Sequence, residues 1–167
     1  MKKQMKKKTK NKINNLKKEK YRKAIFGVVY SKDSLGRIEY LILKRKKHWK
    51  GWEFTKGKIE KKETKKSAAK REVKEETGLK ILNIKEFKEK GKYLYKKRLK
   101  DRPEIMGQTY SLFGLQVKKG RVKLDKIEHN GHKWVSFKEA YKKLTWPNQR
   151  KCLEIVDNWI KDKSKNK

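Results

Sequence analysis

The sequence predicts a single domain of the α/β class, with helices packed on a mixed central sheet. Its 167 residues fit one compact domain and leave little for a second. Between Ala24 and Ile160, apolar residues gather into short clusters, whereas both ends of the chain are almost entirely charged. These clusters follow the order strands, helix, strands, helices, which is typical of a mixed sheet with helices packed on it.

The predicted domain begins with a β-hairpin. Apolar runs at residues 24–30 and 40–43 indicate strands, and the segment 33–36 carries the residues of a turn. The aromatic-rich segment 48–54 follows the second strand. We expect residues 56–57 to form a glycine-containing loop after it.

The next predicted element is a helix over residues 63–77. Gly78 follows it directly, at the position expected of a helix C-cap. In the last helix, apolar residues recur at helical spacing, and Trp146–Pro147 separates it from the helix before it. The remaining expected elements are strands at 81–87, 92–95, 109–117 and 133–135, a loop at 96–107, and helices at 137–144 and 148–160.

Basic segments flank the predicted domain. Residues 1–23 are rich in Lys with few aliphatic side chains, and we expect a flexible arm or a frayed helix there. Residues 161–167 form a similar, shorter basic tail. The expected domain therefore spans residues 24–160.

The sequence carries no signal for secretion or membrane insertion. The N-terminus lacks the apolar core of a signal peptide, and no apolar stretch approaches membrane-spanning length. The single cysteine, Cys152, excludes an internal disulfide and a Cys-based zinc site, and its helical surroundings favour a small buried hydrophobe. We expect a cytoplasmic protein without a membrane partner.

The net charge of the chain is strongly positive. Its 53 Lys and Arg residues face 19 Asp and Glu residues, which gives a net charge of +34. Such a surface attracts polyanions, so RNA is a possible partner of the basic arm and surface. The alternative is that exposed positions drifted toward Lys without a dedicated partner, and the excess of Lys over Arg favours this second explanation.

Three glutamates form the most informative cluster in the sequence. Glu72, Glu75 and Glu76 are spaced three and four residues apart, so a helix brings their carboxylates together. Like charges at this spacing repel one another, and a bound divalent cation would turn the repulsion into coordination. Oxygen ligands of this kind suit Mg²⁺ or Mn²⁺. The sequence therefore predicts a divalent metal site on this helix.

Residues around the glutamates extend this site. Arg71 could hold Glu63 or a neighbouring carboxylate by a bidentate contact and so fix the orientation of a ligand or base. Gly57 lies where the loop must bring its backbone close to a metal or phosphate, which a side chain would obstruct.

The spacing of these residues resembles the signature of the Nudix hydrolases. With ordinary residue frequencies a chance match is on the order of 10⁻⁷ in a chain of this length. The resemblance extends from about residue 23 to residue 160 and implies the Nudix α/β/α sandwich. The nine constrained positions of the signature are filled by Gly57, Glu63, Arg71, Glu72, Val73, Glu75, Glu76, Gly78 and Leu79.

The resemblance also implies a set of metal ligands. Glu72 and Glu76 correspond to the principal Mg²⁺ ligands, and Glu75 to a third or water-mediated ligand. The carbonyl of Gly57 would complete the coordination. Glu128 corresponds to a carboxylate that the family recruits from a later loop, although it could also be an ordinary surface acid.

Catalytic roles follow from the same resemblance. The implied catalytic set is Glu63, Arg71, Glu72 and Glu75. Glu63 and Arg71 resemble the orienting pair, and one carboxylate of the cluster, which we assign to Glu72, would deprotonate the attacking water. The metal would neutralise phosphate oxygens and lower the pKa of that water.

Two segments resemble the diadenosine tetraphosphate hydrolases within the family. Residues 52–60 match the segment that leads into their signature, except that Thr55 replaces the usual Pro. Glu128–His129, Trp134 and Ala140 match a second region. The resemblance implies a nucleotide or dinucleoside polyphosphate as substrate.

Candidate substrate-binding residues are basic or aromatic. Lys44, Arg45 and Lys58 are placed to bind phosphate, although Lys is so frequent that each carries little weight. An adenine clamp would use aromatic side chains, each of which could instead belong to the core. The candidates for this clamp are Tyr93, Tyr95, Tyr110 and Phe113.

Other functions remain open at this point. An RNA 5′-end pyrophosphohydrolase or decapping-like enzyme would use the basic surface for phosphate contacts. An enzyme that removes unwanted nucleoside triphosphates is another alternative. A basic nucleic-acid-binding protein on an inactive Nudix scaffold is disfavoured, because such a protein has no reason to keep repelling carboxylates. The sequence does not indicate the oligomeric state.

Overall fold

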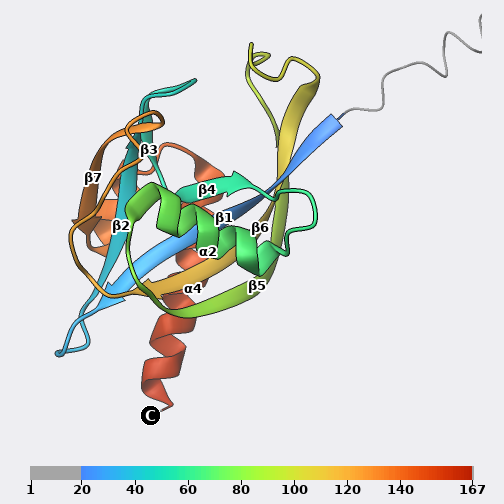
Figure 1. The fold of residues 1–167 in the computed structure, drawn as a ribbon. Helices are drawn as coiled ribbons and strands as arrows, with labels where there is room; N and C mark the ends of the chain where they lie inside the picture. Colours follow the sequence, from blue (N-terminus) through green and yellow to red (C-terminus); the bar gives the residue numbers. More distant parts are fainter. Residues whose placement is uncertain (1–19, 167) are drawn as a thin grey trace, which may run out of the picture.

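The computed structural model describes residues 20–166, which form one mixed sheet with helices on both faces (Figure 1). This architecture confirms the predicted α/β class and its mixed central sheet. The strands are β1 (Lys20–Lys32), β2 (Ile38–Arg45), β3 (Gly51–Glu53), β4 (Thr55–Lys58), β5 (Ile81–Leu94), β6 (Ile105–Val117) and β7 (His129–Val135). The helices are α2 (Lys65–Thr77), α3 (Phe137–Lys143) and α4 (Pro147–Lys165).

The sheet is built around β1. The strand order is β3-β2-β1-β6-β5, with β4 paired to β1 and β7 paired to β2. The β1–β6 pair is parallel, and the others are antiparallel. The predicted hairpin is present, since Tyr30 of β1 lies opposite Tyr40 of β2. Because β1 is covered on both faces, residues 24–31 are buried without interruption.

Helices α2 and α4 lie on opposite faces of this sheet (Figure 1). On one face, Ala68, Ala69 and Val73 of α2 pack with Val29 of β1 and other sheet residues. On the other face, α4 contributes a second apolar cluster that includes Cys152, which is buried as predicted. The arrangement is therefore an α/β/α sandwich. None of the helices in residues 20–166 has the length and apolar character needed to cross a membrane.

Both ends of α2 are fixed by local contacts. The side chain of the N-cap Thr64 accepts a hydrogen bond from the backbone N–H of Ser67. Gly78 ends the helix as predicted, with a left-handed φ of 68°, and its N–H donates to the Lys74 carbonyl. These caps set where the glutamates of α2 stand relative to the sheet.

Residues 55–58 correct the prediction of a loop. They form β4, which pairs antiparallel with β1, so that Gly57 lies opposite Ile25. Lys and Gly have low strand propensity, but pairing with the central strand overrides that local preference.

Other boundaries also differ from the sequence prediction. The two strands expected at 81–87 and 92–95 are one strand, β5, which is interrupted by an irregularity between Glu86 and Lys90. The loop expected at 96–107 ends earlier, because β6 starts at Ile105, and β7 starts at His129 rather than at residue 133. Strand pairing extends each of these segments beyond its apolar centre.

The ends of the folded region extend into the segments expected to be basic arm and tail. β1 begins at Lys20, where it pairs in parallel with Ile105, so residues 20–23 belong to the sheet. The rest of the expected arm lies outside the described residues. α4 continues to Lys165, well into the expected tail.

Candidate active site

Helix α2 presents its three glutamates at different depths. Glu76 is 3% exposed and faces the sheet, and the Glu72 side chain is 12% exposed. The Glu75 side chain is 57% exposed and lies near Arg71. The predicted acidic face is therefore present, but it rises from a buried carboxylate at Glu76 to a solvent-facing one at Glu75.

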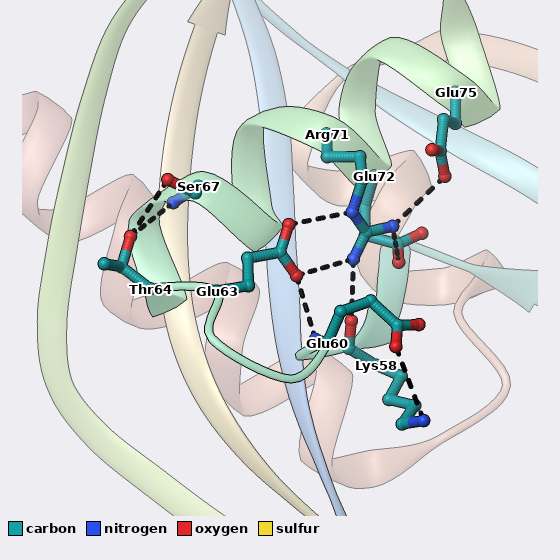
Figure 2. A network of polar contacts seen from close by, with 8 residues as sticks. All are labelled: Lys58, Glu60, Glu63, Thr64, Ser67, Arg71, Glu72 and Glu75. Atoms are coloured by element: carbon teal, nitrogen blue, oxygen red, sulfur yellow. Dashed lines mark hydrogen bonds and ion pairs between the residues drawn. The ribbon is translucent and has the colours of Figure 1, made fainter.

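Arg71 connects these carboxylates to the loop before α2 (Figure 2). Its Nε and Nη2 donate to the two carboxylate oxygens of Glu63 at 2.8 and 2.9 Å. Its Nη1 donates to Glu72 at 2.7 Å and to Glu75 at 3.1 Å, and Nη2 also donates to the Lys58 carbonyl at 2.8 Å. The bidentate contact expected between Arg71 and Glu63 is thus present. Hydrogen bonds from Arg71 lower the pKa of Glu63 to about 2.

Gly57 makes room for the Glu72 side chain. A Cβ on Gly57 would lie 1.8 Å from Cδ of Glu72 and within 2.3 Å of both carboxylate oxygens. The group that this glycine admits is a carboxylate of α2, and the close approach of its backbone to a metal or phosphate stays a prediction. Burial raises the pKa of Glu72, Arg71 opposes this effect, and Glu75 and Glu128 reinforce it.

Glu128 joins the same cluster from the segment before β7. Its carboxylate accepts a 2.7 Å hydrogen bond from Nη1 of Arg45, and its carbonyl accepts from the N–H groups of Lys46 and Lys47. Arg45 is 6% exposed and also contacts Glu53. Arg45 lines a cavity beside this cluster, and its guanidinium also contacts protein carboxylates and the Lys47 carbonyl. The phosphate contact expected of Arg45 stays a prediction.

A buried polar cluster lies at the centre of the site. The cluster consists of Glu76, Glu128 and His129. Each contributes one potential metal-ligand atom, a carboxylate oxygen or a ring nitrogen, and these atoms all lie within 4.8 Å of one another. Oε2 of Glu76 has no hydrogen-bond partner among residues 20–166. Burial raises the pKa of Glu76 well above its usual value, and the nearby Glu53, Glu72 and Glu128 add to this effect. An unpartnered buried carboxylate beside further carboxylates is the environment that a divalent cation would stabilise.

Glu53 and His129 are parts of the site to which sequence reasoning gave no role. Both side chains are fully buried, and His129 Nε2 lies 3.0 Å from Glu53 Oε1. Burial alone would raise the pKa of Glu53, but Lys56, His129 and Arg45 outweigh it and lower the pKa to about 2. Both residues stand inside the segments that resemble diadenosine tetraphosphate hydrolases, and that resemblance was the signal that could have identified them.

A cavity of about 650 Å³ opens beside the carboxylate cluster. Gly57 and Glu128 belong to its wall, which places the cavity next to the expected metal ligands. The ring centroids of Trp49 and Trp146 lie 5.2 Å apart edge to face. The aromatic and basic residues of the wall are Arg22, Phe26, Arg45, His48, Trp49, Lys56, Tyr93, Tyr95, Lys96, Lys97, Arg102 and Trp146.

The aromatic candidates for substrate binding have different positions. Tyr93 and Tyr95 both line the cavity, with ring centroids 6.1 Å apart. Tyr110 is 6% exposed, and its ring stacks on the ring of Phe26 with the centroids 4.0 Å apart. Because Phe26 lines the cavity, Tyr110 packs behind the cavity wall. Phe113 is fully buried in the core beneath α2, and its assignment to a base clamp is wrong.

The basic candidates Lys44 and Lys58 are exposed and are not part of the cavity wall. Lys44 lies against Gly131, and Nζ of Lys58 lies 3.5 Å from Glu60. Their expected phosphate contacts stay predictions. Lys56, which lies between these two residues in the chain, does line the cavity. Its Nζ lies 2.8 Å from Oε2 of Glu53.

The sequence and the fold are similar to those of known proteins. The family model of the NUDIX domain matches residues 20–154. An RNA pyrophosphohydrolase from a Nitratiruptor species is 33% identical over 147 residues, covering 83% of this chain and 95% of that protein.

Two solved structures have similar folds at 25% sequence identity. The C. elegans Ap4A hydrolase in a binary complex superposes with a TM-score of 0.66, covering 84% of this chain and 98% of that chain. The E. coli dihydroneopterin triphosphate pyrophosphohydrolase also gives a TM-score of 0.66, covering 80% and 94% of the respective chains.

Proposed function

The chain belongs to the Nudix family of hydrolases, and we propose that it uses Mg²⁺ to cleave a phosphoanhydride bond in a nucleoside polyphosphate. The observation that carries the proposal is the buried, unpartnered carboxylate of Glu76, with Glu72 and Glu128 beside it. A fold maintains such mutual repulsion at a cost in stability, and binding of a cation would remove that cost.

The side chains of this cluster fit a divalent cation. Glu72, Glu76 and Glu128 would hold it, with Glu75 and the carbonyl of Gly57 as further ligands. All of these donors are oxygen atoms, which suits Mg²⁺ and also Mn²⁺. The cation, when bound, would supply charge neutralisation for phosphate oxygens and a more acidic water.

The protein's own groups orient the base. Arg71 donates to Oε1 of Glu72 and leaves Oε2 free of that contact, so we assign Oε2 as the atom that accepts the proton of the attacking water. Glu63 holds Arg71 by two hydrogen bonds and prevents it from rotating away. Glu63 and Arg71 therefore act by positioning Glu72.

Diadenosine tetraphosphate is the substrate that we propose first. Its phosphate chain would lie along the basic wall of the cavity, where Arg22 and Lys56 can neutralise it, and its end would meet the carboxylates at Glu128. An adenine can stack on Tyr93 or Tyr95 in the same cavity. The C. elegans Ap4A hydrolase, with a similar fold, supports this choice.

RNA with a 5′-triphosphate is the second candidate substrate. It is favoured by the net charge of +34 and by the similarity of the chain to the RNA pyrophosphohydrolase from Nitratiruptor. Lys96, Lys97 and Arg102 line the cavity on the loop between β5 and β6, where they could contact phosphates beyond the first nucleotide.

A substrate panel tests the proposal. Purified protein with Mg²⁺ is incubated with diadenosine tetraphosphate, 5′-triphosphorylated RNA, deoxynucleoside triphosphates and ADP-ribose, and the products are resolved by chromatography. We expect ATP and AMP from diadenosine tetraphosphate, and a loss of several orders of magnitude in kcat for Glu76→Gln. Glu86→Gln, at a solvent-facing carboxylate on β5, is the matched control and should keep full activity.

The outcomes of the panel separate the candidates. Cleavage of RNA alone would replace diadenosine tetraphosphate as substrate but retain the chemistry. Activity that survives a chelator, or that Glu76→Gln leaves intact, would refute the metal-dependent mechanism.

A further inference from the structure

Glu53 on β3 is a fully buried carboxylate that the mechanism above does not use. Its Oε1 accepts a hydrogen bond from Arg45 Nη1 at 3.1 Å and lies 3.0 Å from His129 Nε2. Its Oε2 lies 2.8 Å from Nζ of Lys56. A charge is retained at such depth when it is paired, and three partners converge on this one.

One of these partners leads directly to Glu128. The same Nη1 of Arg45 that contacts Glu53 donates to Glu128 Oε2 at 2.7 Å, and Nε of Arg45 donates to the Lys47 carbonyl. The guanidinium is thereby fixed by three acceptors. Glu53 is the most buried of them and belongs to a strand paired with β2, whereas Glu128 belongs to the segment before β7 and its side chain is 30% exposed.

We infer that Glu53 is a positioning residue, which holds Arg45 so that Arg45 fixes the carboxylate of Glu128 toward the metal cluster. The inference rests on the proposed function, in which Glu128 is a metal ligand. Without the charge on Glu53, Arg45 loses its buried counter-ion and can turn toward Glu128 or solvent. The Glu128 carboxylate then loses its fixed orientation.

Lys56 offers a different route for an effect of Glu53. The Lys56 side chain is 14% exposed, lines the cavity and lies over the ring of Trp49 at 5.2 Å from the centroid. If Glu53 acted mainly by placing Lys56, its loss would weaken substrate binding and appear in KM. Action through Arg45 and Glu128 instead predicts a loss in kcat.

A double-mutant cycle distinguishes the two routes. Glu53→Gln should lower kcat about 10- to 100-fold with little change in KM. In a Glu128→Gln background, the same change should lower kcat by no more than about threefold, because its target is already gone. Asp157→Asn, at a buried carboxylate bonded to Tyr40 on the far face of the sheet, is the matched control and should reduce kcat equally in both backgrounds or not at all.

Two further measurements keep the inference testable. If Glu53→Gln does not fold, Arg45→Gln breaks the same connection and should show the same dependence on Glu128. Mn²⁺ affinity, measured by electron paramagnetic resonance without any substrate, should fall about 10- to 100-fold in Glu53→Gln.

The results have distinct meanings. A wild-type protein that binds Mn²⁺ but cleaves nothing in the panel refutes the proposed function, and the Mn²⁺ affinity of Glu53→Gln still tests the inference. A loss of kcat that is equally large in the Glu128→Gln background, or an effect confined to KM, would overturn it.

Discussion

Individual side chains of the site are held by contacts that leave them little freedom. Arg71 donates to Glu63 from Nε and Nη2, and its Nη1 donates to Glu72 and Glu75 (Figure 2). Glu72 in turn occupies the space left by the missing side chain of Gly57. Because small displacements of reacting groups reduce rates strongly, the geometry around Glu72 is the most sensitive point of the proposed site.

Gly57→Ala tests this sensitivity. The added Cβ would overlap the Glu72 carboxylate, so Glu72 or β4 must move, and we expect kcat to fall about 100-fold or more. Gly131→Ala is the control, since its Cβ would meet Lys44 at an ordinary 3.5 Å and should leave kcat unchanged. Steady-state kinetics on the best substrate of the panel, with circular dichroism to check folding, give the answer. Normal turnover in Gly57→Ala would contradict the role assigned to Glu72.

At the level of secondary-structure elements, α2 determines how deep each carboxylate lies. Ala68, Ala69 and Val73 allow the helix to pack closely on the sheet, and this packing buries Glu76 while Glu75 stays at the surface. Helical spacing predicts that the glutamates share a face. It does not predict their different exposure, which depends on the strands beneath.

Gly78→Ala tests the end of this helix. Gly78 has a φ of 68°, and an L-residue in that conformation costs about 1 kcal/mol relative to glycine. We expect the free energy of unfolding in urea to fall by about that amount. In Gly120→Ala, the added Cβ would meet nothing closer than 3.9 Å, and no loss is expected. Equal stabilities of the two variants would argue against the importance of the left-handed cap.

On the scale of the whole molecule, the positive charge is the dominant property. Among residues 20–166, basic side chains line the cavity beside the carboxylate cluster, including Arg22 at the start of β1. Residues 1–19, which precede β1, contain nine Lys and one Glu. A long anionic substrate that leaves the cavity could contact both regions.

Deletion of residues 1–19 tests whether this segment binds RNA. Because the deletion ends before Lys20, the first residue of β1, it leaves this strand intact. We expect weaker binding of triphosphorylated RNA and a shallower salt dependence, by about 0.7 in the log–log slope per lost phosphate contact. Hydrolysis of diadenosine tetraphosphate should not change, which serves as the internal control. An unaltered salt dependence of RNA binding would mean that residues 1–19 do not contact the RNA. The lysines of this segment would then be explained by a drift of exposed positions toward Lys.

The sequence was sufficient for features that depend on local spacing. The shared face of the α2 glutamates and the cap at Gly78 follow from helical geometry and chain order. The residues alone left open whether Arg71 contacts Glu63 or a neighbouring carboxylate, and the resemblance to the Nudix hydrolases implied the pair that the structure contains. The fold class followed from the order of apolar clusters in the same way. Aromatic side chains were harder to assign: Tyr93 lines the cavity but Phe113 lies in the core, although both belong to expected strands.

Tertiary structure alone decided what depends on which strands are neighbours. Residues 55–58 are a strand because β1 pairs with them, and Arg45 contacts carboxylates because β2 lies between β3 and the segment before β7. Glu53 and His129, 76 residues apart in the chain, meet for the same reason. A sequence records the spacing of residues along a chain, whereas burial and pairing between distant strands arise only when the sheet has formed.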